Sequence, residues 1–220
     1  KLKKYKIRWL NHLTDLPNFP TIFIANEFFD ALPIKQFIKK KNKWYERNIK
    51  YSKSSKAKIL DLLTTVKKLE TKVGFKISSG QKFIEFSPLS LKYLKYISKS
   101  IKLNNGGLLI IDYGYLDKQM KNTLKSISKH KFNDVLENFG KSDISHDLNF
   151  KLIEKIVNML GLKVNGITSQ KYFLEKLGIL ERAEIISKDV PFSEKANIYF
   201  RLKKLIDINE MGHLFKVMFI

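Results

Sequence analysis

The stretch KFIEFSPLSLKYLKYISKSIKLNNGGLLIIDYGY, residues 82–115, decides the fold class. Its first apolar run, 83–86, is typical of a strand end, and the Ser-Pro pair at 87–88 supplies an N-cap and a proline at the first helical position. Leucines and isoleucines then recur at helical spacing until Asn-Asn-Gly-Gly at 104–107, which tolerates positive φ and ends a helix. Leu-Leu-Ile-Ile at 108–111 predicts a buried strand. Strand, helix and strand in this order predict a parallel α/β sheet with a right-handed crossover.

Two further elements are predicted upstream. Residues 21–25 (TIFIA) form a short continuous apolar run, which predicts a strand buried on both faces. Residues 35–51 predict an inserted β-hairpin around a polar turn at 42–43. The Ser/Lys-rich segment 52–58 predicts a linker, with weak order beyond it to about Gly80.

Downstream of residue 115 the pattern predicts a mainly helical segment, residues 145–207, and a closing strand. The expected elements are a strand at 122–130, helices at 149–160, 170–177, 179–187 and 192–205, extended chain at 163–168, and a last strand at 215–220.

The composition excludes several kinds of site. The chain has no cysteine, which rules out disulfides and thiolate metal sites. Its four histidines have no i,i+4 partner, and no metal site is predicted. No apolar run approaches the roughly 20 residues of a membrane span, and the first residues lack the pattern of a signal peptide. Because the chain does not begin with methionine, we expect Lys1 to be an internal position of a longer product, or the start of a truncated reading frame.

The formal net charge of +21 comes almost wholly from lysine, since only four of the 42 basic residues are arginines. Readers of phosphates and bases usually exploit the planar guanidinium of arginine. The lysines are also scattered over most predicted elements. We therefore interpret the charge as compositional bias on a solvated surface and expect no specific nucleic-acid partner, only salt-sensitive binding to polyanions. A basic nucleic-acid-binding protein remains an alternative.

Two predicted strands end in polar groups, Asn26-Glu27 and Asp112-Tyr113. In a doubly wound sheet, ligands bind outside the carboxyl ends of the strands. Carboxylates and carboxamides there can accept hydrogen bonds from amino and hydroxyl groups of a cofactor and can orient a nucleophile. The alternative is that Asn26 caps a helix with Glu27 at its positive end. Asp112 could likewise open a turn in which Gly114 supplies the positive φ.

Asp30 follows Glu27 by three residues and lies on the same side if the segment is helical, which makes it a candidate acid/base partner. No two of the ten glycines are separated by a single residue, so the chain contains no GxG turn. Gly106-Gly107 precedes a strand and cannot place a cofactor at a helix N-terminus. These residues alone therefore predict an incomplete α/β domain.

Several strings taken together resemble one family. They are ANEFFDALPIKQF at 25–37, EFSP at 85–88, LIIDYGY at 109–115, DIS at 143–145, LNF at 148–150, SQ at 169–170, FL at 173–174, LGI at 177–179 and EMGHLFKV at 210–217. They resemble the MidA-like family of S-adenosylmethionine-dependent methyltransferases, which includes the mitochondrial complex I assembly factor that methylates arginine. The resemblance extends from about Ile7 to Ile220.

The resemblance implies a class I, Rossmann-like methyltransferase fold in which residues 1–220 are the C-terminal part of a single domain. Its cofactor is S-adenosyl-L-methionine (SAM). Asn26, Glu27 and Asp30 would be catalytic residues of the cleft after the fourth strand, and Asn26, Asp112 and Tyr113 would bind the cofactor. The family's N-terminal glycine-rich SAM-binding motif has no counterpart here.

The resemblance further implies methylation of a protein arginine, linked to assembly of respiratory complex I, with a core subunit of that complex as substrate. A homodimer is a further expectation. The expected location is the cytoplasm of a bacterium or the mitochondrial matrix of a eukaryote. The alternative is a non-catalytic assembly module of the same fold, in which the hairpin at 35–51 contacts a partner.

Overall fold

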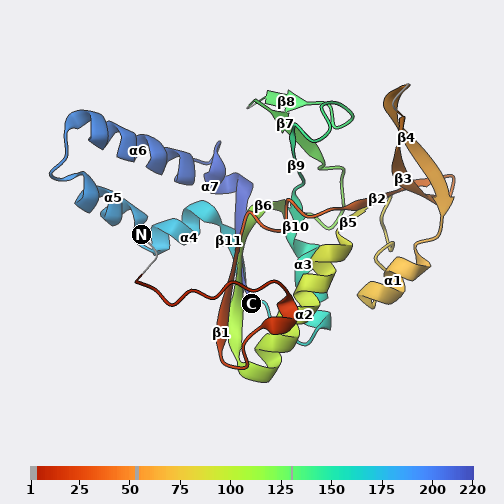
Figure 1. Cartoon of the computed structure of the whole chain (residues 1–220), viewed down its shortest axis with the longest axis horizontal. Coiled ribbons are helices and arrows are strands. Elements are labelled where there is room, and N and C mark those ends of the chain that lie inside the picture. The colour runs from red at the N-terminus through yellow and green to blue at the C-terminus, as the bar shows by residue number, and fades with distance from the viewer. Residues whose placement is uncertain (1–3, 53–54, 130) are drawn as a thin grey trace.

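The computed structural model describes residues 4–52, 55–129 and 131–220 as a mixed α/β protein (Figure 1). Its helices are the 3-10 helix η1 (Leu13–Asp15) and α1 (Lys67–Val73), α2 (Pro88–Asn104), α3 (Phe150–Met159), α4 (Gln170–Lys176), α5 (Ile179–Ser187), α6 (Phe192–Ile206) and α7 (Met211–Leu214). Its strands are β1 (Thr21–Asn26), β2 (Lys35–Lys40), β3 (Lys43–Ser52), β4 (Ser55–Thr64), β5 (Phe83–Phe86), β6 (Gly106–Tyr115), β7 (Lys125–Ser128), β8 (Lys131–Asn133), β9 (Asp143–Ser145), β10 (Leu148–Asn149), β11 (Gly166–Ser169) and β12 (Phe215–Phe219).

The central sheet has the strand order β1-β6-β12-β11, with β10 beside the end of β6. β1 and β6 are parallel, and their register places Asn26 beside Ile111. β12 and β11 run antiparallel to their neighbours. The carboxyl ends of β1 and β6 therefore meet at one edge of the sheet, as the sequence predicts for a doubly wound arrangement.

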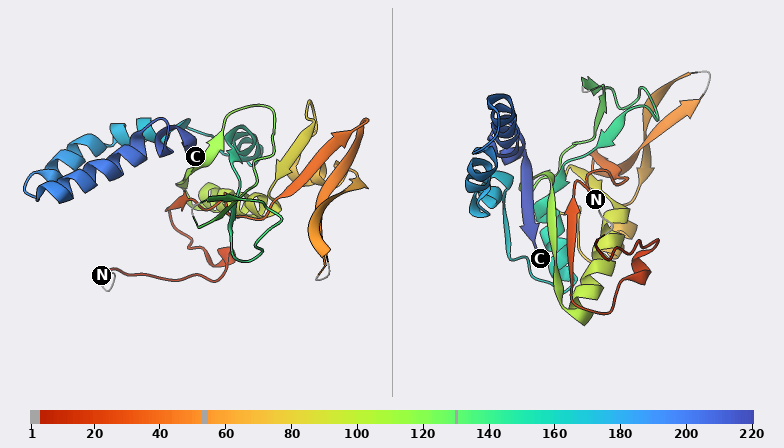
Figure 2. Two further views of the ribbon diagram at one scale, coloured as in Figure 1. Left: turned by 90° about the horizontal axis from the view of Figure 1, so that it is seen from above. Right: turned by 60° about the vertical axis from the view of Figure 1, so that its left-hand side comes forward.

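α2 begins and ends at the predicted signals. The Ser87 hydroxyl accepts the backbone N–H of Ser90 at 3.1 Å, and Pro88 occupies the first turn. Asn105 (φ 63°) and Gly106 (φ 131°) reverse the chain into β6. α2 and α3 pack on one face of the sheet, whereas α4–α7 extend from its β11–β12 side as a helical arm (Figures 1 and 2).

The core lies between the central sheet and α2 and α3. Its most deeply buried apolar side chains are those of Phe29, Ile84, Leu94, Leu108, Ile110, Phe150, Val157 and Met218. Burial of this size is the main favourable term in folding, at about 25 cal/mol per Å² of apolar surface.

The predicted parallel crossover from the strand at 83–86 to the strand at 108–111 is wrong. β5 does not join the parallel sheet but pairs antiparallel with β2, in a second sheet of order β4-β3-β2-β5. The parallel partner of β6 is β1. A four-residue apolar strand carries no local signal of the sheet to which it belongs, because that choice is made by long-range pairing.

The prediction that β1 is buried on both faces is also wrong. Ala25 is buried beneath α2, but Ile22 and Ile24 are 63% and 70% exposed. Within the described residues β1 pairs only with β6, and the face carrying Ile22 and Ile24 has no helix over it. A short continuous apolar run therefore does not by itself indicate a strand buried on both faces.

The hairpin predicted at 35–51 forms, but its turn is Lys41-Asn42, both at positive φ, one residue before the predicted turn at 42–43, because Lys43 already pairs with Lys40. The predicted linker at 52–58 is wrong where the structure describes it, because β4 begins at Ser55 and pairs along β3; residues 53–54 lie outside the described residues. The weak order expected up to Gly80 is also wrong, since β4 is followed by α1.

Downstream, α3, α4, α5, α6, β11 and β12 lie at or near the predicted positions. The strand expected at 122–130 is β7, which pairs with β8 and β9 in a third sheet, and residue 130 lies outside the described residues. In the part of the chain that the structure covers, no helix is both long enough and apolar enough to cross a membrane.

Candidate functional site

The carboxyl ends of β1 and β6 present an amide and a carboxylate to solvent. The chain leaves β1 through Glu27, whose backbone N–H donates to the Ile111 carbonyl at 3.0 Å. Glu27 has a φ of 47°, a conformation that is costly for a residue other than glycine. The Asn26 amide lies 3.5 Å from the Glu27 carboxylate, and both side chains are exposed. Polar groups therefore stand where an open α/β sheet binds its ligands.

No helix follows β1 before β2 in this part of the structure. The alternative in which Asn26 caps a helix is therefore wrong, and so is the helical spacing assumed for Glu27 and Asp30. The segment after β1 instead folds over the end of β6, and it is held there by Asp112.

Asp112 lies fully buried beneath this segment. One oxygen of its carboxylate accepts the backbone N–H groups of Phe29 at 3.1 Å and Asp30 at 3.3 Å, and the other accepts that of Tyr113 at 2.9 Å. Burial, and after it the charge of the nearby Asp30 carboxylate, raise the pKa of Asp112 to about 7, against the lowering effect of the backbone donors. Asp112 thus joins the end of β6 to the segment after β1.

The turn expected at Asp112 is wrong. β6 continues through Tyr115, and Gly114 does not have a positive φ. Glycine is required there by packing, because a Cβ at Gly114 would lie 2.4 Å from the Leu148 carbonyl oxygen and 2.5 Å from the Phe150 ring. The close approach lets β10 lie against the end of β6.

Asp30 is 7% exposed, and its Oδ1 has no hydrogen-bond partner. Burial raises its pKa, opposed first by His146 and by the N–H of Ala31 and then by Lys125. His146 donates its backbone N–H to the Asp30 carbonyl at 3.1 Å, and its Nε2 is also buried without a partner. Two buried, titratable side chains therefore keep free hydrogen-bonding capacity at the sheet edge.

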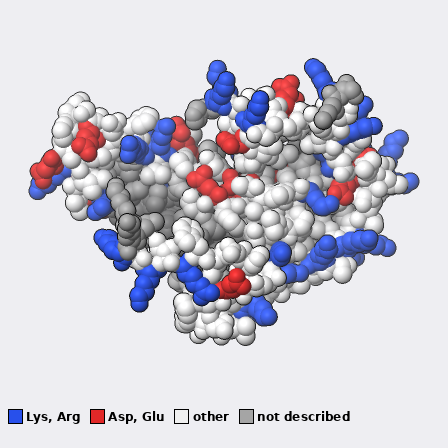
Figure 3. Space-filling view, in the orientation of Figure 1, with Lys and Arg blue, Asp and Glu red and all other residues white. Residues whose placement is uncertain are grey.

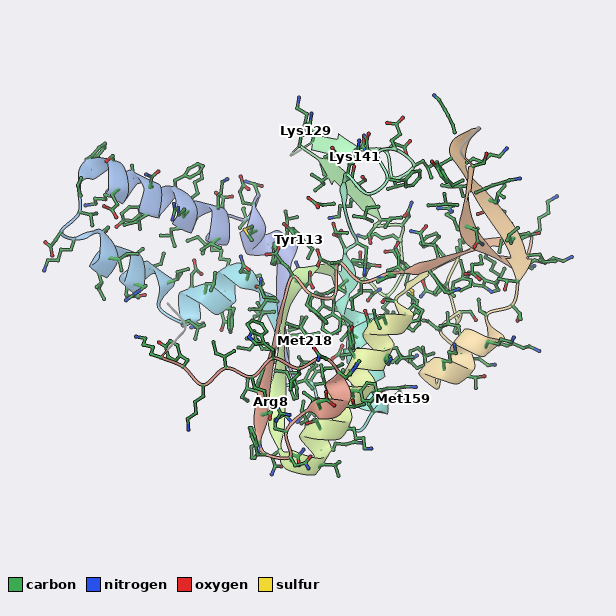
Figure 4. The ribbon with its side chains drawn as sticks, in the orientation of Figure 1. Arg8, Tyr113, Lys129, Lys141, Met159 and Met218 are labelled. Atoms are coloured by element: carbon green, nitrogen blue, oxygen red, sulfur yellow. The ribbon has the colours of Figure 1, made fainter. Side chains whose placement is uncertain are left out.

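The charges of four carboxylates act on Tyr113, and we call these carboxylates the acidic cluster: Glu27, Asp30, Asp112 and Asp147. Burial is the largest cause that raises the pKa of Tyr113, and these four carboxylates raise it further. Its ring packs on Phe215 with a centroid distance of 4.0 Å. Figure 3 shows acidic side chains gathered on the middle of the face where Figure 4 labels Tyr113, with lysines spread around them.

Basic side chains border the acidic cluster. Lys125 forms an ion pair with Asp147 at 2.5 Å and lies 5.1 Å from the centre of the Tyr113 ring. Lys216 lies opposite Asp112 in the β6–β12 register, is 9% exposed, and donates to the His213 carbonyl. Burial lowers the pKa of Lys216, against the charge of Asp147.

A buried network connects the cluster to the second sheet. Glu85 on β5 accepts the Gln36 amide at 2.6 Å and the Thr123 backbone N–H at 3.2 Å, and it also accepts the Thr123 hydroxyl. The same Thr123 oxygen accepts the Asp147 backbone N–H at 2.9 Å. The position of Asp147 therefore depends on a carboxylate that is distant in sequence.

The structure brings all the predicted site residues to one edge: Asn26, Glu27, Asp30, Asp112 and Tyr113. Sequence reasoning missed Asp147, His146 and Lys216. Lys216 had a local signal, because it is the one charged residue in the apolar strand FKVMF. The other two lie in the connection from β9 to β10, and nothing in their local pattern marks them.

The residues present can accept hydrogen bonds from the polar groups of a nucleoside cofactor. They do not include the glycine-rich turn whose backbone would hold such a cofactor. Asn26 and Glu27 supply exposed acceptors, whereas no glycine turn follows β1 or β6 in the described ranges. Gly106 lies at the opposite end of the sheet, where a Cβ would lie 2.0 Å from the Thr21 carbonyl oxygen. Gly106 thus serves strand packing.

Fold and site together define an α/β protein with a polar edge at the carboxyl ends of its parallel strands, the place where open α/β sheets bind ligands. The family model described as "Putative S-adenosyl-L-methionine-dependent methyltransferase" matches residues 1–168, and the chain belongs to this family, whose cofactor is SAM.

Curated relatives include "Protein arginine methyltransferase NDUFAF7, mitochondrial" of Danio rerio, 27% identical over 210 residues, which are 96% of this chain and 49% of the relative. The homolog of Caenorhabditis elegans is 31% identical over 180 residues, or 80% of this chain and 42% of the relative. The chain therefore spans about half the length of these relatives.

A solved structure has the same fold. It is a "likely methyl transferase" from Burkholderia thailandensis bound to S-adenosyl-homocysteine, with a TM-score of 0.75 at 23% identity, covering 96% of this chain and 55% of that one.

Proposed function

We propose that this chain forms the acceptor side of a class I methyltransferase and that the complete protein methylates arginine on a protein substrate. The observation that carries the proposal is the acidic cluster around Tyr113 in a chain of net charge +21. Such a cluster at the ligand-binding edge favours a cationic acceptor group. The printed names of the curated relatives support the choice of arginine.

The side chains of the cluster suit a guanidinium acceptor. Carboxylates accept its N–H groups in pairs, with strong charge-assisted hydrogen bonds. Glu27 is exposed and can make such contacts, whereas the Tyr113 ring is already packed on Phe215 and has the Lys125 ammonium 5.1 Å from its centre. The Asp30 carboxyl has a raised pKa and a free Oδ1, which suits it to take the proton that the acceptor nitrogen loses.

Bound SAM would supply an electrophilic methyl group on its sulfonium. Asn26 and Glu27 are the exposed acceptors for its amino group or ribose hydroxyls. Asp112 is buried and fully hydrogen-bonded, so its part is to hold the segment carrying Asp30. In a complete domain, the glycine cradle would belong to the half of the relatives' length that this chain does not cover.

The substrate we propose is an arginine of a respiratory complex I core subunit, in the cytoplasm of a bacterium or the mitochondrial matrix of a eukaryote. The test measures transfer of labelled methyl from SAM by the full gene product, to that subunit and to a variant with the arginine replaced by lysine. Asn26→Ala and Glu27→Ala should lower transfer and leave the melting temperature unchanged, while Glu137→Ala, at an exposed carboxylate on a distant loop, should change neither. Transfer at the wild-type rate by both site variants would contradict the residue roles, and no transfer by the wild type would contradict the function.

A non-catalytic assembly module is the second candidate function. It is favoured by the second sheet, of order β4-β3-β2-β5, which exposes apolar side chains. Tyr51, Leu62 and Leu63 of β3 and β4 are 64%, 54% and 65% exposed. Leu62 and Leu63 are consecutive residues of β4 and point to opposite faces, so this sheet exposes apolar side chains on both of its faces, and exposed apolar side chains are typical of protein contacts. Under this candidate Leu63→Glu abolishes binding to a partner, while Glu27→Ala leaves binding and cellular function intact.

A further inference from the structure

A groove lined by lysines lies between α1 and α2 and shares no residue with the acidic cluster. Its volume is about 460 Å³. Four lysines line it, one from α1 and three from α2, together with three apolar or aromatic residues. We call it the lysine groove, and its residues are Lys72, Pro88, Leu91, Lys92, Lys95, Tyr96 and Lys99. Figure 3 shows basic side chains in a row over the part of the molecule where Figure 1 labels α1.

The lysines of α2 follow one face of the helix. Its exposed residues include four lysines separated by three, four and three positions, which is helical spacing: Lys92, Lys95, Lys99 and Lys102. Like charges at this spacing destabilise a helix. α3 and α4 each pair a lysine with a glutamate of the same helix, Lys151 with Glu154 and Lys171 with Glu175. α2 contains no acidic residue, so its lysine face is left to bind an anion from outside the helix.

The nearby carboxylates do not neutralise this face. Residues 65–105 contain nine lysines and two glutamates. Glu70 accepts the backbone N–H and the hydroxyl of Ser78, and Glu85 is buried in the network with Gln36 and Thr123. In the part of the chain that the structure describes, none of the four groove lysines forms an ion pair. The groove therefore keeps its full positive charge.

The contacts that the groove lysines do make are with uncharged groups. The Lys95 ammonium donates to the Lys72 carbonyl at 3.0 Å, and the Lys92 ammonium lies 6.0 Å from the centre of the Tyr96 ring. Lysine ammonium groups bind carboxylates more strongly, through charge-assisted hydrogen bonds. A carboxylate-bearing ligand would thus gain from each of these side chains.

The lining of the groove distinguishes between anionic partners. Readers of nucleic acid use arginine forks or free aromatic faces, but the groove has no arginine and its one aromatic ring lies beneath Lys92. Proteins that lie on a membrane insert apolar side chains beyond their basic ones, whereas Leu91 is 6% exposed beneath exposed lysines. A short peptide matches the volume of the groove. Its carboxylates would reach the lysines and its apolar side chains would reach Leu91 and Tyr96.

From these observations we infer that the lysine groove is the docking site for an acidic peptide segment of a protein partner, in which apolar side chains stand among glutamates or aspartates. The inference does not depend on methyltransferase activity. The test is binding of a fluorescein-labelled peptide, Glu-Glu-Leu-Glu-Glu-Leu-Glu-Glu, to the full gene product at physiological salt, followed by fluorescence anisotropy. The wild type should bind this peptide and should not bind its counterpart in which every glutamate is glutamine.

Paired variants separate the groove from net charge. Lys92→Gln with Lys99→Gln should weaken binding about fivefold or more, the effect of two lost exposed charge pairs. Lys195→Gln with Lys203→Gln removes the same charge from exposed positions of α6 on the helical arm and should leave binding unchanged. Both double variants should retain the circular dichroism of the wild type, because these four lysines are exposed and form no ion pair in the described residues.

Three results would overturn the inference. They are a wild type that does not bind the glutamate peptide at about 100 µM, a groove variant that binds it as tightly as the wild type, and equal weakening by the two double variants. Tighter binding of an oligothymidylate of equal charge, lost in the groove variant, would assign the groove to nucleic-acid phosphates instead. Flotation with phosphatidylglycerol vesicles in the absence of peptide binding, lost in the same variant, would assign it to a membrane.

Discussion

Replacing Asp112 with asparagine should change how stability depends on pH. The folded chain holds the Asp112 proton up to a pKa of about 7, whereas the unfolded chain loses it near 3.8. A raised carboxyl pKa means that the unfolded state binds fewer protons between these values, so stability falls as pH rises from about 4 to about 7. Asparagine has the same shape and does not titrate.

The magnitude follows from the two pKa values. Linkage gives a cost of about 2 kcal/mol at pH 5 and about 4 kcal/mol at pH 8, because each pKa unit corresponds to about 1.4 kcal/mol. Asparagine also changes the hydrogen bonds that the side chain makes with the backbone N–H groups, at about 1 kcal/mol each and at both pH values, whereas the extra strength of these bonds to the ionised carboxylate at pH 8 is already contained in the pKa of about 7. Relative to wild type, Asp112→Asn should therefore gain roughly 2–3 kcal/mol between pH 5 and pH 8.

The assay is urea unfolding of both proteins at pH 5, 6, 7 and 8, followed by circular dichroism, with the free energy of unfolding extrapolated to water. Asn26→Ala, at an exposed neighbour, serves as a control that should run parallel to wild type. If the difference between Asp112→Asn and wild type stays constant within about 0.5 kcal/mol over this range, the burial argument for Asp112 is refuted.

Three further outcomes are expected. Gly114→Ala should destabilise the fold by about 2 kcal/mol or more in urea unfolding, because the added Cβ overlaps Leu148. Gly166→Ala is the control and should cost less than about 1 kcal/mol, because a Cβ there has no neighbour within 4 Å. Equal costs for the two variants would contradict the close approach at Gly114. Glu85→Gln should lower the free energy of unfolding by about 2–3 kcal/mol, because it leaves the two Thr123 donors without a matched acceptor. The control Glu137→Gln should change it by nothing measurable. A Glu85→Gln variant as stable as the wild type would show that the Glu85–Thr123 network does not stabilise the fold. Binding to heparin or DNA should vanish between roughly 50 and 200 mM salt, and binding that survives this change would revive a nucleic-acid function.

Local signals predicted α2 to α6 well, whereas α1 and α7 were not predicted. Ser87 and Pro88 start α2 by satisfying its first N–H groups, and Asn105 and Gly106 end it, so both boundaries were readable from neighbouring residues. The hairpin was also predicted, although its turn lies at Lys41-Asn42 and not at the predicted 42–43.

The sequence does not indicate which strands pair when they are far apart along the chain. β5 and β1 are both short apolar runs, and only the folded chain shows that β1 pairs with β6 while β5 pairs with β2. β4 was missed because its Ser/Lys-rich start hides the apolar residues that follow.

The candidate site likewise has residues that the local sequence predicts and residues that it does not. Asn26, Glu27, Asp112 and Tyr113 follow apolar strand segments, and strand ends are where such a sheet binds ligands. Asp147 reaches the cluster through Thr123 and Glu85, which lie 24 and 62 residues away from it in the sequence. No local pattern encodes that connection.

Binding of S-adenosyl-homocysteine to the full gene product, measured by calorimetry, tests the central claim most directly. The account predicts saturable binding by the wild type, weakened at least about tenfold by Glu27→Ala and unchanged by Glu137→Ala. A full-length wild type that binds no S-adenosyl-homocysteine, or a Glu27→Ala variant that binds as tightly as the wild type, would contradict it.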